Sequence, residues 1–147
     1  MTDRPQTHAS RTPKQELVGY HAHIYYAAET KVQLLALLNS LRNSDVASSV
    51  RSIGRCHDQP VGPHPCPSAQ IDVAPQAIAE VLPWLALNRG ELSVYVHLNT
   101  ADELWDHVHN AVWMGKRFEI VNLECLENPN HRDLDEMRAY VKKDCSG

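Results

Sequence analysis

The sequence lacks the features that would assign it at once to several common functional classes. Lys and Arg total 14 against 18 Asp and Glu, giving a formal net charge of −4 with no basic stripe. Nucleic acid is therefore not an expected partner. No apolar run is long enough to span a bilayer, so no membrane partner is expected. Residues 1–14 are polar, unlike a secretory signal peptide, and we expect a cytoplasmic protein.

Cysteine is also scarce, and the sequence gives no sign of a disulfide framework. The four cysteines are more typical of free thiols or metal ligands in a protein that is not exported. The nine histidines are the one compositional excess. A chain of 147 residues can form one domain with a real core. We expect a disordered arm over residues 1–15, a domain over 16–126 and a polar tail over 127–147.

The stretch from residue 18 to residue 26 alternates strictly, as a strand with two unlike faces does. Val18, Tyr20, Ala22, Ile24 and Tyr26 form an apolar side, and His21, His23 and Tyr25 form the other. Residues two apart on a strand are separated by roughly 6.6 Å, so both imidazoles can reach one ligand. On its own, such a pair is as compatible with an accidental arrangement on a solvated face as with a binding site.

Periodicity and turn residues predict the order of the other elements. Strands are expected near 17–26, 47–53, 68–73 and 92–98, helices near 29–42, 75–88 and 101–114, a short fifth strand near 118–122 and helical turns within 133–143. The order β-α-β-β-α-β predicts an α+β, ferredoxin-like fold with an extra C-terminal helix and a short strand. In that fold the sheet order is 4-1-3-2 and both helices cover one face.

This topology brings distant histidines together on the open face of the sheet. We expect strand four to run antiparallel to strand one, which places His97 beside His21 or His23. We expect strand three to be parallel to strand one, so that the proline-rich loop carrying His64 enters at the same edge. The third helix leaves from that edge and can bring His107 with it.

Converging neutral imidazoles indicate a metal site, and open positions suit zinc or iron(II). If one ligand were a carboxylate, it would have to come from Asp72 or Asp106, and neither is a convincing ligand. A site of three histidines is therefore the simpler interpretation.

Two other interpretations do not require catalysis. The residues Cys56, His57, His64 and Cys66 have the chemistry of a structural zinc site, although their spacing is not a standard finger pattern. Alternatively, the open sheet face is a homodimer interface that binds a small ligand.

Several motifs in this order resemble the DOPA 4,5-dioxygenase-like family, which consists of small extradiol dioxygenases and bacterial relatives. The matching stretches are residues 21–26 (HAHIYY), 62–65 (GPHP), 83–84 (PW), 88–93 (NRGELS), 97–102 (HLNTAD), 106–107 (DH) and 113–115 (WMG). The resemblance covers roughly residues 17–120 and implies a ferredoxin-like fold, in agreement with the pattern.

The resemblance also implies an activity, namely extradiol ring cleavage of a catechol-type, DOPA-like substrate with O₂. The implied cofactor is iron(II), with zinc or another divalent metal as an alternative, bound by His23, His64 and His97. The other implied roles are proton transfer by His21 or His107, hydrogen bonding by Tyr25 or Tyr95, and a substrate carboxylate held by Arg89 or Arg55. We also expect a homodimer.

Overall fold

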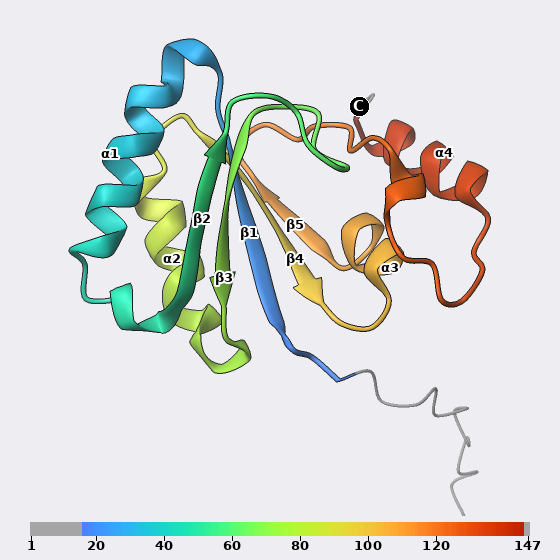
Figure 1. Ribbon diagram of the computed structural model, residues 1–147, viewed down its shortest axis with the longest axis horizontal. Helices are drawn as coiled ribbons and strands as arrows, with labels where there is room; N and C mark the ends of the chain where they lie inside the picture. The colour runs from blue at the N-terminus through green and yellow to red at the C-terminus, as the bar shows by residue number, and fades with distance from the viewer. Residues whose placement is uncertain (1–15, 146–147) are drawn as a thin grey trace, which may run out of the picture.

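A computed structural model describes residues 16–145, with side chains up to residue 143, and centres on one antiparallel sheet (Figure 1). Its strands are β1 (Gly19–Tyr25), β2 (Val50–His57), β3 (Ser68–Val73), β4 (Ser93–Asn99) and β5 (Ala111–Met114). The strand order is β2-β3-β1-β4-β5, so β1 lies in the middle. The disordered arm expected over residues 1–15 lies outside the described residues.

Two helices, α1 (Lys31–Arg42) and α2 (Ile78–Asn88), cover one face of the sheet (Figure 1). Leucines at helical spacing give α1 a buried stripe of Leu34, Leu37, Leu38 and Leu41. Pro75 opens the single 3₁₀ turn that precedes α2, a position where its missing N–H costs nothing. The apolar face of β1 packs against these helices, with Ala22 and Ile24 essentially inaccessible.

The part of the chain that follows β4 covers the other face of the sheet over β1, β4 and β5. Figure 1 shows α3 (Glu103–Val108) and α4 (Leu134–Cys145) on the side away from α1 and α2. A second apolar cluster forms here around Tyr25 and Tyr95, and contains Leu104, Val108, Ile120, Leu123, Leu126, Met137 and Val141. Within residues 16–145, no helix has the length and apolar content needed to cross a bilayer.

The ferredoxin-like α+β fold is confirmed, because β4, β1, β3 and β2 are neighbours in the predicted order. Strand β3 has the predicted ends, and β2 continues past the predicted end to His57. The expectation that the first and third strands are parallel is wrong, because Tyr20 faces Val73 and Tyr25 faces Ser68 in an antiparallel register. The crossover through α1 makes β2 run in the direction of β1, and the loop after β2 then reverses the chain.

The predicted helix over residues 101–114 is also wrong in its second half. Helix α3 ends at Val108, and residues 111–114 form β5 instead. Residues 111–114 (AVWM) are all apolar, and such a short run does not distinguish a helix from a strand. The amide of Leu98 donates to the carbonyl of Asn110, and the chain pairs with β4 from there. The short strand predicted near 118–122 is absent. Helix α4 is longer than the one or two helical turns predicted within 133–143.

Candidate functional site

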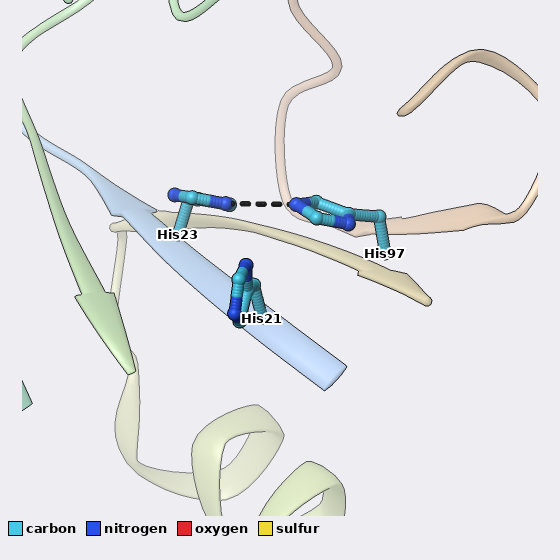
Figure 2. A group of neighbouring side chains, drawn as sticks. All are labelled: His21, His23 and His97. Atoms are coloured by element: carbon cyan, nitrogen blue, oxygen red, sulfur yellow. Dashed lines mark hydrogen bonds between the residues drawn. The ribbon is translucent and has the colours of Figure 1, made fainter. Parts of the chain in front are cut away.

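Strand β1 presents His21, His23 and Tyr25 on the face opposite α1 and α2. The antiparallel register with β4 places His97 across from His21 and Tyr95 across from His23. Figure 2 shows the three imidazoles of His21, His23 and His97 turned toward one another from these two strands. The alternation in the sequence therefore creates the core and the candidate site from one strand.

The imidazoles of His23 and His97 form the closest pair. Their Nε2 atoms are 3.0 Å apart, and the side chains are only 4 % and 2 % exposed. His97 Nδ1 lies 2.8 Å from the carbonyl oxygen of Leu98. Because a carbonyl can only accept, Nδ1 carries the proton in the neutral ring, and Nε2 offers a lone pair to the site.

His21, which is half-buried, completes a group with the chemistry of a metal site. The nitrogens of His21, His23 and His97 all lie within 4.8 Å of one another, and this is the one such group of His, Cys, Asp or Glu among residues 16–145. Two nitrogens that each bind one ion at about 2.1 Å can lie 3.0 Å apart. The donor set therefore fits a divalent ion that prefers imidazole.

The rival zinc site is not assembled, because Cys56, His57, His64 and Cys66 do not form such a group in the described part of the chain. Cys56 instead packs with the core between the sheet and α1–α2, whereas Cys66 packs on the other side of the sheet.

His64 reaches the cluster from the opposite end of β1 to the one expected, since the loop after β2 joins β3 beside Tyr25. The His64 ring centroid is 4.0 Å from that of His23, and its Nδ1 lies 2.8 Å from the hydroxyl of Tyr25. The backbone amide of Val121 donates to the carbonyl of Pro63, which fixes the loop next to His64.

His107 approaches from α3, and its ring centroid is 3.9 Å from that of His97. Its Nδ1 donates to the carbonyl of Glu103, so the neutral ring offers the lone pair of Nε2. The hydroxyl of Tyr95 donates to the backbone carbonyl of His107. This bond directs the phenol proton to the backbone of α3, and the hydrogen bond to a substrate that the resemblance implies for Tyr95 stays a prediction.

Burial keeps all five imidazoles neutral near pH 7. Desolvation lowers the pKa of His23 and His97 well below the ordinary value, and repulsion from the neighbouring histidines lowers it further. Desolvation, followed by repulsion from His107, lowers the pKa of His64 to about 4. Desolvation also lowers the pKa of His21 and of His107, although nearby carboxylates oppose it. Neutral imidazole is the form that binds a metal.

The two carboxylates considered from the sequence have different surroundings. Asp106 is buried and accepts from the backbone and hydroxyl of Thr100 and from Asn110, so it holds α3 against the end of β4. Asp72 Oδ1 is buried without a hydrogen-bond partner, 3.9 Å from His21 Nε2 and 3.9 Å from Arg51 NH1. The sequence did not single out the nearness of Asp72 to His21, although both face the same side of adjacent strands.

Arg89 lies at the C-terminal end of α2, and its NH1 donates to the carbonyls of Leu92 and Gly90. These bonds fix the connection between α2 and β4. Its role as a substrate clamp stays a prediction.

An aromatic wall that sequence reasoning missed stands beside the histidines. Tyr95 stacks on Trp113 at 4.5 Å between centroids, and Tyr25 makes edge contacts with Trp113 and Phe118. The sequence pattern predicts a helix at Trp113, and a helix there offers no reason to place its ring next to Tyr95.

Comparison with known proteins gives one consistent group of relatives. Residues 20–124 match the model of the Dopa 4,5-dioxygenase family. The chain is 34 % identical over 125 residues to DOPA 4,5-dioxygenase of Amanita muscaria, a match that covers 82 % of this chain and 55 % of that protein. It is 30 % identical over 110 residues to an uncharacterized 21.2 kDa protein of Botryotinia fuckeliana, covering 69 % and 60 %.

A crystal structure from Nostoc punctiforme, named as a candidate dioxygenase, is also similar. Its TM-score is 0.68 at 33 % sequence identity, over 74 % of this chain and 90 % of that one. The chain spans little more than half the length of the curated relatives that it matches.

Proposed function

The chain belongs to the Dopa 4,5-dioxygenase family, and from that premise we propose that it is a metal-dependent dioxygenase that opens the ring of a catechol-type substrate with O₂. The observation that carries this proposal is the pair of buried, neutral imidazoles of His23 and His97, whose Nε2 atoms are 3.0 Å apart. These two nitrogens are within hydrogen-bond distance of each other, and a divalent ion that prefers imidazole can bind both of them.

His23 and His97 are the proposed ligands of a divalent ion, with iron(II) as the first choice. The third ligand is His21, from the compact group, or His64, from the sequence resemblance. When bound, such an ion lowers the pKa of the catechol hydroxyls and holds substrate and O₂ in contact.

His107 is the proposed acceptor of a catechol proton. Its Nδ1 proton is engaged by Glu103, so only the lone pair of Nε2 is available for the site. The nearby wall of Tyr95, Trp113 and Phe118 offers an apolar surface to an aromatic ring and excludes water from one side.

The test is reconstitution of the metal-free protein with iron(II) under anaerobic conditions, followed by a simple catechol such as 4-methylcatechol or L-DOPA and air. We expect a yellow ring-opened product and consumption of O₂ with wild type, and a loss of at least about 100-fold with His97→Ala. His131→Asn is the matched control, because this exposed histidine has a φ of 50°, which asparagine tolerates.

If wild type binds the metal but consumes no catechol, the dioxygenase proposal is wrong and a non-catalytic ligand-binding role replaces it. The homodimer and the cytoplasmic location stay predictions, which gel filtration and fractionation of the source cells can check.

A further inference from the structure

We propose that Tyr25 holds His64 with its proton on Nε2, so that His64 is a hydrogen-bond donor to the bound substrate and not the third metal ligand. The inference concerns the proposed function, and it divides the histidines of the cluster into two chemical kinds. His21, His23 and His97 then form the metal-binding group.

The hydrogen bond between Tyr25 and His64 has only one direction that satisfies both groups. The phenol of Tyr25 is 3 % exposed, and among residues 16–143 His64 Nδ1 is its one hydrogen-bond partner, at 2.8 Å. If Nδ1 carried the proton and donated, the phenol proton would be buried without an acceptor, which costs free energy. The phenol therefore donates to Nδ1, and the neutral ring carries its proton on Nε2.

The Nε2 atom of His64 remains available to a ligand. It has no hydrogen-bond partner within the described chain, yet it is absent from the fully buried polar atoms that lack one, which are Asp72 Oδ1, Arg89 Nε and Arg132 Nε. The Nε2 atom is therefore not fully enclosed, although the His64 side chain is only 6 % exposed. The peptide group that joins Pro63 to His64 is held by two hydrogen bonds, because the His64 amide donates to the carbonyl of Val61 and the Pro63 carbonyl accepts from the amide of Val121.

The site then contains one hydrogen-bond acceptor and one hydrogen-bond donor for a bound substrate. His107 offers the lone pair of Nε2, and His64 offers an N–H. A catechol that binds as its monoanion has a hydroxyl for the lone pair of His107 and a negatively charged oxygen for the N–H of His64, and the remaining hydroxyl proton then passes to His107. Tyr25 is a positioning residue in this arrangement, because it acts through His64.

The direct test is NMR of the metal-free protein labelled with ¹⁵N-histidine, which reports the nitrogen that carries the proton in each ring. We expect the His64 proton on Nε2 in wild type, and a mixture of both tautomers in Tyr25→Phe. Tyr26→Phe is the matched control, because Tyr26 points to the other face and donates to Asp58. A wild-type His64 with its proton on Nδ1 overturns the proposal.

Metal binding gives a second readout that does not depend on turnover. In zinc titrations we expect His97→Gln to weaken binding by more than about tenfold. We expect His64→Gln to stay within about threefold of wild type. If His64→Gln weakens zinc binding as much as His97→Gln does, His64 is a ligand and the proposal fails, whereas the dioxygenase proposal stands.

Substrate binding separates the two proposals further, with 4-nitrocatechol added anaerobically to the iron-loaded protein as the probe. The amide of glutamine can replace an N–H donor, so we expect His64→Gln to bind the probe more tightly than His64→Leu. Equal affinity in both variants and wild type contradicts a donor role for His64. Failure of wild type itself to bind the probe contradicts the dioxygenase proposal, and the NMR result still decides the tautomer of His64.

Discussion

At the scale of single residues, the site depends on side chains whose polar atoms have one available orientation. His97 and His107 each donate the N–H of Nδ1 to a backbone carbonyl, and His64 is paired with a phenol. Each ring therefore shows one defined nitrogen to its neighbours. Backbone carbonyls act here as the groups that orient the imidazoles.

Gly115 is a residue at which backbone conformation and close packing coincide. Its φ is +82°, and a Cβ there would lie 2.8 Å from Arg89 NH1 and 3.1 Å from Ser93 Oγ. We expect Gly115→Ala to lower the free energy of unfolding by about 1–3 kcal/mol, because the strained backbone and the displaced guanidinium both destabilise the folded state. Urea unfolding measures the loss, and Gly90→Ala is the control, since its φ is +57° with open space around it. Equal losses in the two variants would show that the contact with Arg89 contributes nothing.

At the scale of elements, the sequence predicted those whose periodicity is unambiguous. The alternation over residues 18–26 gave β1 and its two faces, and Ile71 and Val73 gave β3. Residues 111–114 form a short apolar run that does not distinguish a helix from a strand, and pairing with β4 decides between them.

The prediction for the site was right for the approach of His21 and His97, because the antiparallel register of β1 and β4 is local to the sheet. His64 arrives next to His23 for a different reason from the one expected, since the relative direction of β1 and β3 was wrong. The pair of Tyr25 and His64 depends on the conformation of a proline-rich loop, which no periodicity describes.

The loop that carries His64 is attached to the segment before the 3₁₀ turn η4 (Leu123–Cys125). Asn122 has a φ of 51°, and its Nδ2 donates to the carbonyl of Gly62 at 3.1 Å. We expect Asn122→Ala to lower the free energy of unfolding by about 1–2 kcal/mol, and Asn122→Gly by less, because glycine keeps the backbone conformation. Thermal unfolding measures both. If the two variants lose the same amount, the side-chain hydrogen bond alone accounts for the effect.

A buried ion pair joins α3 to the C-terminal part of the chain. Asp102 accepts from Arg132 NH2 at 2.8 Å, and Arg132 lies over the ring of Trp105 at 4.0 Å. Burial alone would raise the pKa of Asp102, but hydrogen bonds from Arg132, Trp105 and Asn130 outweigh it and hold the pKa below its usual value.

We expect Arg132→Met to lower the free energy of unfolding at pH 7 by about 2–3 kcal/mol. This is below the loss for a fully buried pair, because the Arg132 side chain is 30 % exposed. Since the pKa is lowered in the folded state, the contribution is present above the usual pKa of 3.8 and is lost as the pH falls through the folded value. Denaturant unfolding of wild type and variant across pH 7 to 3 tests this, and the difference between them should shrink below about pH 4. A constant difference would exclude the ionised Asp102 as its source.

At the scale of the whole molecule, the histidine cluster couples stability to pH. Burial lowers the pKa of His23, His64 and His97 in the folded state, whereas an unfolded chain protonates each near 6.5. The unfolded state therefore binds more protons as the pH falls below 6.5, and the folded state is destabilised in that window.

We expect the metal-free protein to lose at most about 1.4 kcal/mol per pH unit for each of these histidines between pH 6.5 and the folded pKa values. Urea unfolding at pH 7, 6 and 5 measures the slope. The variant His97→Gln should have a smaller slope than wild type. A slope that is the same in both proteins would contradict the burial of neutral imidazoles.

Because β1 has two unlike faces, the same strand determines both the packing of the fold and the position of the candidate site. Ala22 and Ile24 fill one core while His21, His23 and Tyr25 line the other side of the same seven residues. Inserting or deleting a single residue here would exchange the faces, burying imidazoles against α1 and α2 and leaving aliphatic groups beside His97. A gap within this strand would therefore disturb the packing of the core and the candidate site together.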